Sequence, residues 1–278
     1  MFSVNSFIKK ALEEDLFYIG DITTDNLFND LDISKGEICF REEAIVCGVN
    51  FAEQVFKEID PEIKFNTFKT DGELIEGNQK CAVVEGRTKS ILKGERLALN
   101  IMQRLSGIAT RTEMYVKKLR PYNVRIADTR KTTPLFRYFE KYAVKVGGGS
   151  NHRFGLFDAV MIKDNHIVAA GGILNSIEKL RKNIPHTTKI EIEVENYNQA
   201  VEALEAKADI IMLDNIRGQE LEAIVKLLKG KVIVEASGNI NLDTVEDVAS
   251  SGVDVISTGD IIYNARNIDI GMDFKEHK

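Results

Sequence analysis

From residue 123 onward, short apolar stretches alternate with longer amphipathic ones. Stretches such as NQAVEALEAK and GQELEAIVKLLK have apolar residues at helical spacing. This alternation predicts parallel strands joined by right-handed helical crossovers. With six or seven such units, closure into an α/β barrel is favoured over an open sheet. The predicted strands are VRIAD (124–128), AVMIK (159–163), IEIEVE (190–195), DIIML (209–213), KVIVEA (231–236) and VDVIS (253–257).

The first part of the chain, to about residue 112, lacks this regularity. The apolar stretches GEICF, AIVCGV and KCAVVEG are separated by turns such as DGELIEGN and predict short strands. Amphipathic helices are expected over MFSVNSFIKKALEEDLF and ILKGERLALNIMQRL. We therefore expect an N-terminal α/β domain over residues 1–112 and a barrel over residues 113–265. The C-terminal tail, residues 266–278, is expected to return to the first domain or to fray.

Composition narrows the function classes. A chain of 278 residues can form one large domain, or a medium domain with a smaller companion. It contains no apolar run of about 18 residues, and its net charge of −6 argues against a general nucleic-acid surface. Cys39, Cys47 and Cys81 match no CxxC or metal-ligand spacing. We expect a cytoplasmic protein with reduced thiols, no membrane span and no nucleic-acid partner.

Positive charge is concentrated in the middle of the chain. Between Arg96 and Lys163 there are 14 Lys and Arg residues but only 4 Asp and Glu residues. An acidic protein with one cationic segment suggests a confined site for an anion. Chance clustering on solvated helix faces is the alternative, and charge alone does not decide between the two.

Polar groups follow the predicted strands where each one ends. In an α/β barrel these ends form the active-site face, so we expect the groups to converge there. Any single end can instead be an ordinary turn or helix cap. The candidate residues at the ends are Thr129, Arg130, Lys131, Lys163, Asp214, Ser237, Gly238, Asn239, Thr258, Gly259 and Asp260.

The strand IEIEVE carries Glu191, Glu193 and Glu195 on one face. Unpaired charge inside a barrel is costly, so a metal ion or a cationic side chain is expected to neutralise these carboxylates. Glu193 and Asp214, from adjacent strands, could hold a Mg²⁺ ion that also binds phosphate oxygens.

A cationic cluster is expected nearby. Arg130, Lys131, His152, Arg153 and Lys163 end or follow predicted strands or lie in the loop GGGSNHR, with no obvious acidic partners in the local sequence. Guanidinium groups bind carboxylates bidentately, and lysine offers a compact charge for phosphate. The segments ASGN and STGD resemble phosphate cradles, each a weak signal alone.

Together these segments resemble the quinolinate phosphoribosyltransferase family (nicotinate-nucleotide pyrophosphorylase, carboxylating). The matching strings, in family order, are GDITT, ERLALN, LSGIAT, DTRKTTP, EKYAVKVGGGSNHR, IKDNH, EVE, LDN, EASGNI and GVDVISTGDI. The block from Asp128 to His166 is highly specific, whereas GDITT and the glycine turns are weak. One departure is Leu135-Phe136-Arg137, where the family often has Gly-Leu-Arg; we expect an intact site with altered helix packing.

The resemblance implies an N-terminal α/β sandwich joined to an incomplete barrel of about seven units. It implies that quinolinate and phosphoribosyl pyrophosphate react to give nicotinate mononucleotide, CO₂ and pyrophosphate in NAD biosynthesis, with Mg²⁺ as cofactor. It also implies a homodimer, and leaves open a larger assembly such as a hexamer.

The same resemblance implies roles for individual residues. The carboxylates of quinolinate would be bound by Arg130, His152, Arg153 and Lys163. Lys131 would serve the phosphoribosyl donor, Glu193 and Asp214 the Mg²⁺ and ribose, and Ser237, Gly238 and Gly259 the phosphate. Arg96 would reach the site of the neighbouring subunit, although from the residues alone a solvated helix position is an equal alternative.

Three other functions compete with this interpretation. A Schiff-base aldolase could use Lys163 at its strand end, although imine chemistry needs no guanidinium cluster. A sister enzyme on the same scaffold could take another base, but the pairs Arg130/Lys131 and His152/Arg153 favour a dicarboxylate. A binding module for anions would not need acidic residues opposite the cations.

Overall fold

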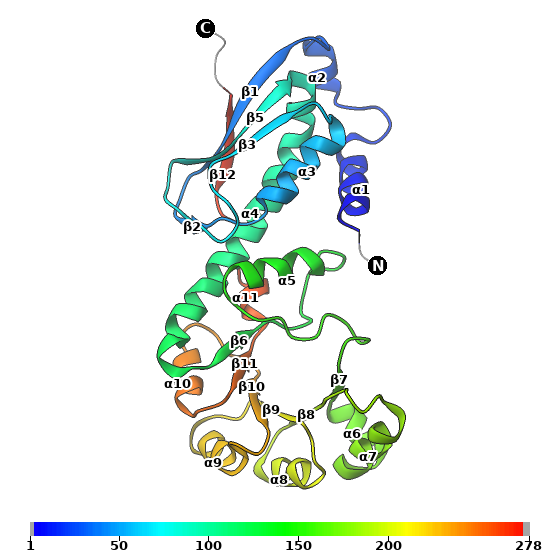
Figure 1. Ribbon diagram of the computed structural model, residues 1–278, viewed down its shortest axis with the longest axis vertical. Helices are drawn as coiled ribbons and strands as arrows, with labels where there is room; N and C mark the ends of the chain where they lie inside the picture. Colours follow the sequence, from blue (N-terminus) through cyan, green and yellow to red (C-terminus); the bar gives the residue numbers. More distant parts are fainter. Residues whose placement is uncertain (1–2, 275–278) are drawn as a thin grey trace. The chain divides into compact units, whose positions relative to one another are not determined.

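The computed structural model describes residues 3–274, which divide into two compact units (Figure 1). The first unit contains the described residues up to Arg111, the segment Tyr138–Gly147 and the described residues from Ala265 onward. The second unit contains Thr112–Arg137 and Gly148–Asn264. Almost all of α5 (Arg137–Val146) therefore belongs to the first unit, although the sequence division placed it in the barrel.

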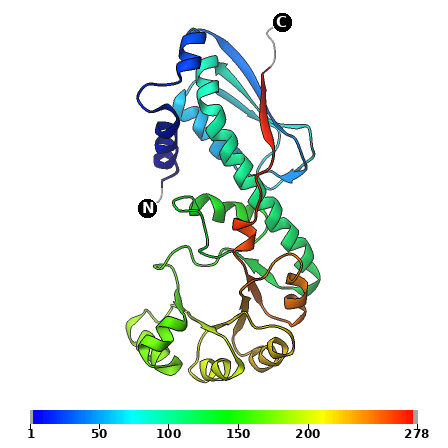
Figure 2. The same cartoon turned by 180° about the vertical axis from the view of Figure 1, so that it is seen from behind.

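The first unit is built on a four-stranded antiparallel sheet with the order β12-β1-β5-β3. Its strands are β1 (Ile33–Phe40), β3 (Lys64–Thr67), β5 (Gln79–Arg87) and β12 (Ile270–Phe274). The last of these comes from the C-terminal tail and lies at the sheet edge, as Figure 2 shows in red. The tail therefore returns to the first unit, and residues 275–278 lie outside the described chain. A separate two-stranded ladder pairs β2 (Ala44–Ile45) with β4 (Leu74–Ile75).

Helices complete the first unit, and local sequence explains where they begin. The first, α1 (Val4–Leu16), starts after Ser3, whose hydroxyl accepts from the Ser6 N–H; Asp21 caps α2 (Ile22–Leu27) in the same way. The amphipathic α3 (Val49–Ile59) buries Val55 and Phe56. The chain then enters α4 (Thr88–Leu119), within which the two units divide.

The second unit is an α/β barrel that does not close. Its parallel strands have the order β6-β11-β10-β9-β8-β7, so the strands of the predicted alternation lie side by side. Ser150 adds one isolated parallel bridge to Ala127, on the edge of the sheet next to β6. The fold class is the expected incomplete α/β barrel with a separate N-terminal α/β unit. The strands are β6 (Arg125–Ala127), β7 (Val160–Ile162), β8 (Ile190–Val194), β9 (Ile210–Asp214), β10 (Ile233–Ser237) and β11 (Val255–Ser257).

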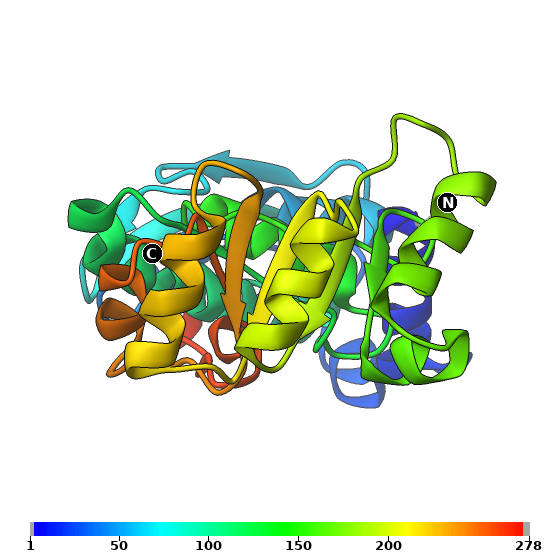
Figure 3. The same cartoon turned by 90° about the horizontal axis from the view of Figure 1, so that it is seen from below.

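Crossover helices cover the outer face of these strands, and Figure 3 shows several of them next to one another. In α9, Leu221, Ile224 and Leu228 are buried at helical spacing, so its apolar stripe faces the sheet. The helices of this unit are η1 (Arg120–Tyr122), α6 (Asp164–Ala170), α7 (Ile173–Asn183), α8 (Tyr197–Glu205), α9 (Gly218–Leu228), α10 (Val245–Ser250) and α11 (Asp260–Tyr263).

Cys39, Cys47 and Cys81 are all buried free thiols, and burial raises the pKa of Cys47 well above its usual value. Within residues 3–274, no helix combines the length and the apolar character that crossing a bilayer requires.

Candidate active site

A polar cavity of about 480 Å³ opens at the carboxyl ends of the barrel strands. Thirteen of the residues proposed from sequence line it, so the strand ends do converge on one site. These thirteen are Thr129, Arg130, Lys131, His152, Arg153, Lys163, Glu193, Asp214, Ser237, Gly238, Asn239, Thr258 and Gly259.

Two cationic side chains of the cavity have no acidic ion-pair partner among the described residues. Neither Arg130 nor Lys131 forms an ion pair with any acidic residue in the described part of the chain. Burial, and then the nearby positive charge of Arg130, lowers the pKa of Arg153, so the two guanidinium groups lie close enough to repel. Arg153 donates through Nη1 to the Ala159 carbonyl at 3.1 Å, which leaves its other donors for a ligand. An anion bound here would relieve the repulsion.

The acidic part of the cavity comes from β8 and β9. Lys163 forms an ion pair with Glu193, so a cationic side chain neutralises this carboxylate. Asp214 ends β9, and one of its oxygens accepts from the Asn215 side chain at 2.8 Å. Opposite charges from neighbouring strands therefore meet at one barrel mouth.

The loop after β10 is shaped for close approach to a ligand. Gly238 has φ +83°, and a Cβ there would lie 2.4 Å from the Asn215 Oδ1 atom. Asn239 donates to the same Asn215 oxygen at 3.0 Å. Arg217 donates to the carbonyls of Ser237, at 3.4 Å, and of Gly238. These contacts turn the two carbonyls toward Arg217 and hold the loop in one conformation.

His152, which lines the cavity, forms a cluster with Glu191 and Glu235, which do not line it. Glu191 and Glu235 are only 4% and 5% exposed. Burial, and then the Glu191 charge, raises the pKa of Glu235 to about 7. Asp128, which is fully buried, holds the loop above them by accepting from the His152 N–H at 2.9 Å and the Asn151 side chain at 2.7 Å.

Two proposed site residues do not line the cavity. Asp260 is 2% exposed and accepts hydrogen bonds from Tyr115 and Asn264, so its carboxylate faces the core of the second unit. The sequence showed only that Asp260 follows a strand, not which way its carboxylate points. The helix α11 begins at Asp260, and the side chain points inward. Arg96 is an exposed residue of α4 in the first unit.

Sequence reasoning missed several residues of the site. Met161, Met212, Ser257 and Tyr263 also line the cavity. Tyr263 lies beside Gly259, where a Cβ would be 2.7 Å from the Tyr263 ring. Alternation along β7 and β9 could have placed Met161 and Met212 on the inner face. No sequence motif marks Tyr263, or Arg217, which directly precedes α9.

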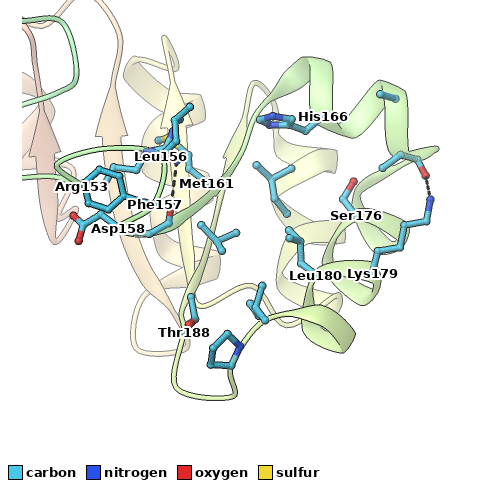
Figure 4. A pocket seen from close by; sticks show the side chains of 17 residues that line it. Arg153, Leu156, Phe157, Asp158, Met161, His166, Ser176, Lys179, Leu180 and Thr188 are labelled. Atoms are coloured by element: carbon cyan, nitrogen blue, oxygen red, sulfur yellow. Dashed lines mark hydrogen bonds between the residues drawn. The ribbon is translucent and has the colours of Figure 1, made fainter.

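A second cavity, of about 850 Å³, lies beside β7 and is largely apolar (Figure 4). In that view Arg153, Phe157 and Met161 lie on one side, and the side chains of α6 and α7, including His166 and Leu180, lie on the other. Its lining offers few charged groups at the strand ends, so it does not carry the chemistry of the polar cavity.

Comparison with known proteins gives a consistent family. Residues 108–273 match the model of the quinolinate phosphoribosyl transferase C-terminal domain, and residues 21–106 match that of the N-terminal domain. The chain belongs to the quinolinate phosphoribosyltransferase family.

Relatives of this family cover nearly the whole chain. A probable nicotinate-nucleotide pyrophosphorylase [carboxylating] of Methanocaldococcus jannaschii is 42% identical, over 98% of this chain and 97% of that protein. A protein of the same description from Bacillus subtilis is 40% identical, over 91% and 88%. The solved nicotinate-nucleotide pyrophosphorylase of Francisella tularensis has a TM-score of 0.93 at 40% identity, covering 98% and 96% of the two chains.

The departure from the family motif at Leu135 has a backbone consequence. Leu135 has φ +63°, in the left-handed region, and its side chain is 86% exposed. A glycine adopts this conformation without the steric cost of about 1–2 kcal/mol that a Cβ brings.

Leu135→Gly is therefore expected to stabilise the protein by up to about 1 kcal/mol, since relief of the left-handed strain exceeds the added chain entropy. Urea unfolding of both proteins measures the change. Leu156→Gly is the matched control: Leu156 is also exposed but has no positive φ, so glycine there should destabilise. A loss of stability in both variants would contradict the interpretation.

The raised pKa of Glu235 predicts a pH dependence of stability. The folded state binds this proton more tightly than the unfolded state, so the stabilisation is present at pH values below about 4.5 and is lost as pH rises through about 7. Relative to Glu235→Gln, the wild type should lose up to about 3 kcal/mol over that window. Denaturant unfolding of both proteins from pH 4.5 to 8 measures it; parallel stability curves would exclude this shift.

Proposed function

We propose that this protein transfers the phosphoribosyl group of phosphoribosyl pyrophosphate to the ring nitrogen of quinolinate, yielding nicotinate mononucleotide, CO₂ and pyrophosphate for NAD biosynthesis. The observation that carries the proposal is the convergence of Arg130, Arg153 and Lys163 with Glu193 and Asp214 in one cavity. Membership of the quinolinate phosphoribosyltransferase family supports the same reaction.

The cationic part of the cavity suits a dicarboxylate. Quinolinate carries two adjacent carboxylates, and Arg130 and Arg153 present planar donors that bind such groups bidentately. Lys163 adds a third positive charge from the end of β7. His152 was placed in the same set from sequence; it lines the cavity, but both ring nitrogens face protein groups.

The other half of the cavity suits the donor. Glu193 and Asp214 supply the hard carboxylate oxygens that Mg²⁺ prefers, so the donor set fits that ion. Mg²⁺ held by these carboxylates would neutralise part of the charge on pyrophosphate oxygens. Thr129 and Lys131 would contact the donor. The small and polar residues of the two glycine turns would hold its phosphates: Ser237, Gly238, Asn239, Thr258 and Gly259.

The chemistry requires positioning more than covalent catalysis. The bond between the anomeric carbon and the pyrophosphate oxygen breaks as the ring nitrogen attacks, with oxocarbenium character at the carbon. Lys131 offsets charge building on the departing pyrophosphate. The alkylated ring is cationic, so the 2-carboxylate can leave as CO₂ and the resulting carbanion takes a proton. Lys163 forms an ion pair with Glu193, and the reaction requires no imine at its amine.

Stoichiometry tests the proposed reaction. With quinolinate, phosphoribosyl pyrophosphate and Mg²⁺, we expect CO₂ and nicotinate mononucleotide to appear in equal amounts, and neither product when one substrate is withheld. Mononucleotide without CO₂, or no product with both substrates present, would overturn the proposal.

A second copy of the chain is proposed to complete the site with Arg96. Arg96 is exposed, and the first unit also exposes apolar side chains near its N-terminus, namely Phe17, Tyr18, Ile19, Ile22, Leu27 and Leu31. These six residues fall within one stretch of 15 residues, and an apolar patch that is contiguous on the surface marks an interaction site. A two-fold dimer would give each site one Arg96 from its partner.

Mixing two inactive variants tests this exchange. We expect Arg96→Ala and Lys131→Ala each to be strongly impaired. After the subunits exchange, mixed dimers hold one intact site each, so about one quarter of wild-type activity should return. Activity that stays at the level of the parents, although exchange is demonstrated, would place Arg96 outside the partner's site.

A further inference from the structure

The cluster below the cavity has a definite hydrogen-bond geometry. Glu191 and Glu235 come from β8 and β10, the two neighbours of β9. The Nε2 atom of His152 lies 3.2 Å from both carboxylate oxygens of Glu191 and 3.6 Å from the Oε1 atom of Glu235. That Oε1 atom is buried and has no hydrogen-bond partner among the residues that the structure describes.

The second ring nitrogen of His152 fixes the tautomer. The backbone N–H of Arg153 donates to His152 Nδ1 at 2.7 Å. A nitrogen that accepts a hydrogen bond carries no proton, so the neutral ring must carry its proton on Nε2, directed at Glu191. The ring therefore has no N–H left to offer a ligand in the cavity.

This tautomer decides between two uses of the cluster. Its three side chains place ligand atoms within 4.8 Å of one another, close enough for a metal ion. A histidine that binds a metal through one nitrogen donates its other N–H to an acceptor. Here the other nitrogen accepts, so a metal on Nε2 would require the Arg153 backbone to turn away. The geometry favours a proton on Nε2 over a metal ion.

We propose that Glu191 is a positioning residue that fixes the His152 ring and, through its Nδ1 atom, holds Arg153 in place for the acid substrate. The role of Arg153 in binding the acid substrate rests on the proposed function, whereas the hydrogen-bond geometry of the cluster does not. Arg153 is then held at two points: its backbone N–H by His152, and its guanidinium by the Ala159 carbonyl at 3.1 Å, the bond dashed in Figure 4. Fixing a guanidinium before the substrate arrives lowers the entropy lost on binding.

The tautomer can be measured on the whole 278-residue chain without substrate. The chain has four histidines, so a ¹⁵N-histidine sample gives few ring signals, and His152→Gln assigns the one of interest. We expect a protonated Nε2 and an unprotonated Nδ1, both unchanged when Zn²⁺ or Mn²⁺ is added. A proton on Nδ1, or a metal-induced loss of the Nε2 proton, would overturn the proposal.

Kinetics then test what the positioning does. Glu191→Gln keeps an acceptor oxygen and should stay within about threefold of wild type in the KM for quinolinate, whereas Glu191→Val loses it and should raise that KM about tenfold. The KM for phosphoribosyl pyrophosphate should change little in either variant. Glu195→Val, at an exposed position just beyond the same strand, is the matched control.

The results of these measurements distinguish the positioning role from the proposed function. A rise in both KM values together, or an unchanged quinolinate KM in Glu191→Val, would reject the positioning role. If the wild type does not turn over quinolinate, the proposed function fails, while the tautomer measurement still tests the cluster. If Glu191→Val does not fold, Glu191→Leu provides the same comparison, with Glu191→Gln again as its conservative partner.

Discussion

Arg153→Ala and Arg130→Ala are each expected to raise the KM for quinolinate by about two orders of magnitude, because each removes charge-assisted hydrogen bonds to a carboxylate in a partly buried site. The structure supports the size of the effect: both side chains line the cavity, and Arg130 has no acidic partner in the described residues to compete with the substrate. Steady-state kinetics with quinolinate varied at saturating donor measures the change.

The control for these variants is Arg181→Ala. Arg181 lies on α7 and pairs with Asp209, so its loss should leave both KM values unchanged. Near-normal saturation with quinolinate in both cavity variants would remove these arginines from the acid-binding site. A rise confined to the KM for phosphoribosyl pyrophosphate would assign them to the donor instead.

Asp214→Asn and Glu193→Gln should each raise the Mg²⁺ concentration for half-maximal activity at least about tenfold, because each removes a charged oxygen ligand. Substitution of a residue that only supports a ligand already lowers metal affinity by about tenfold or more. The larger effect is expected for Asp214, since Glu193 also has Lys163 as an ion-pair partner. The measurement is a Mg²⁺ titration of the rate at fixed substrate concentrations.

Glu222→Gln supplies the matched change on α9, where the carboxylate is exposed and distant from the cavity lining. Its Mg²⁺ titration should superimpose on that of the wild type. If the Asp214 and Glu193 titrations superimpose as well, these two residues do not hold the ion.

Much of the second unit could be predicted from apolar periodicity. The strand ends after VRIAD, AVMIK and DIIML were placed within a few residues, and their polar groups do meet in one cavity. Strand alternation also located Glu191 and Glu193 on the inner face, where His152 and Lys163 pair with them. These features follow from local periodicity, which one sequence contains.

Other features depend on contacts that local sequence does not contain. Asp260 follows a strand like the residues that line the cavity, but its carboxylate accepts a hydrogen bond from Tyr115, far away in the chain, and faces the core. The helix α5 looks like a barrel helix, yet its buried Phe139 packs against Phe7 and Phe51 of the first unit. Glu235 gave no signal, because its importance arises only when β8 and β10 bring it beside Glu191.

The proposed reaction depends on a cationic half-site that requires two carboxylates on one pyridine ring, and comparing quinolinate with nicotinate tests this requirement directly. Nicotinate lacks the 2-carboxylate, so it would leave guanidinium donors unpaired in the cavity, a defect that enzymes commonly penalise by about 10³-fold or more. We predict that kcat/KM with Mg²⁺ and phosphoribosyl pyrophosphate favours quinolinate by at least that factor. Equal use of the two acids, or a preference for nicotinate, would contradict the account.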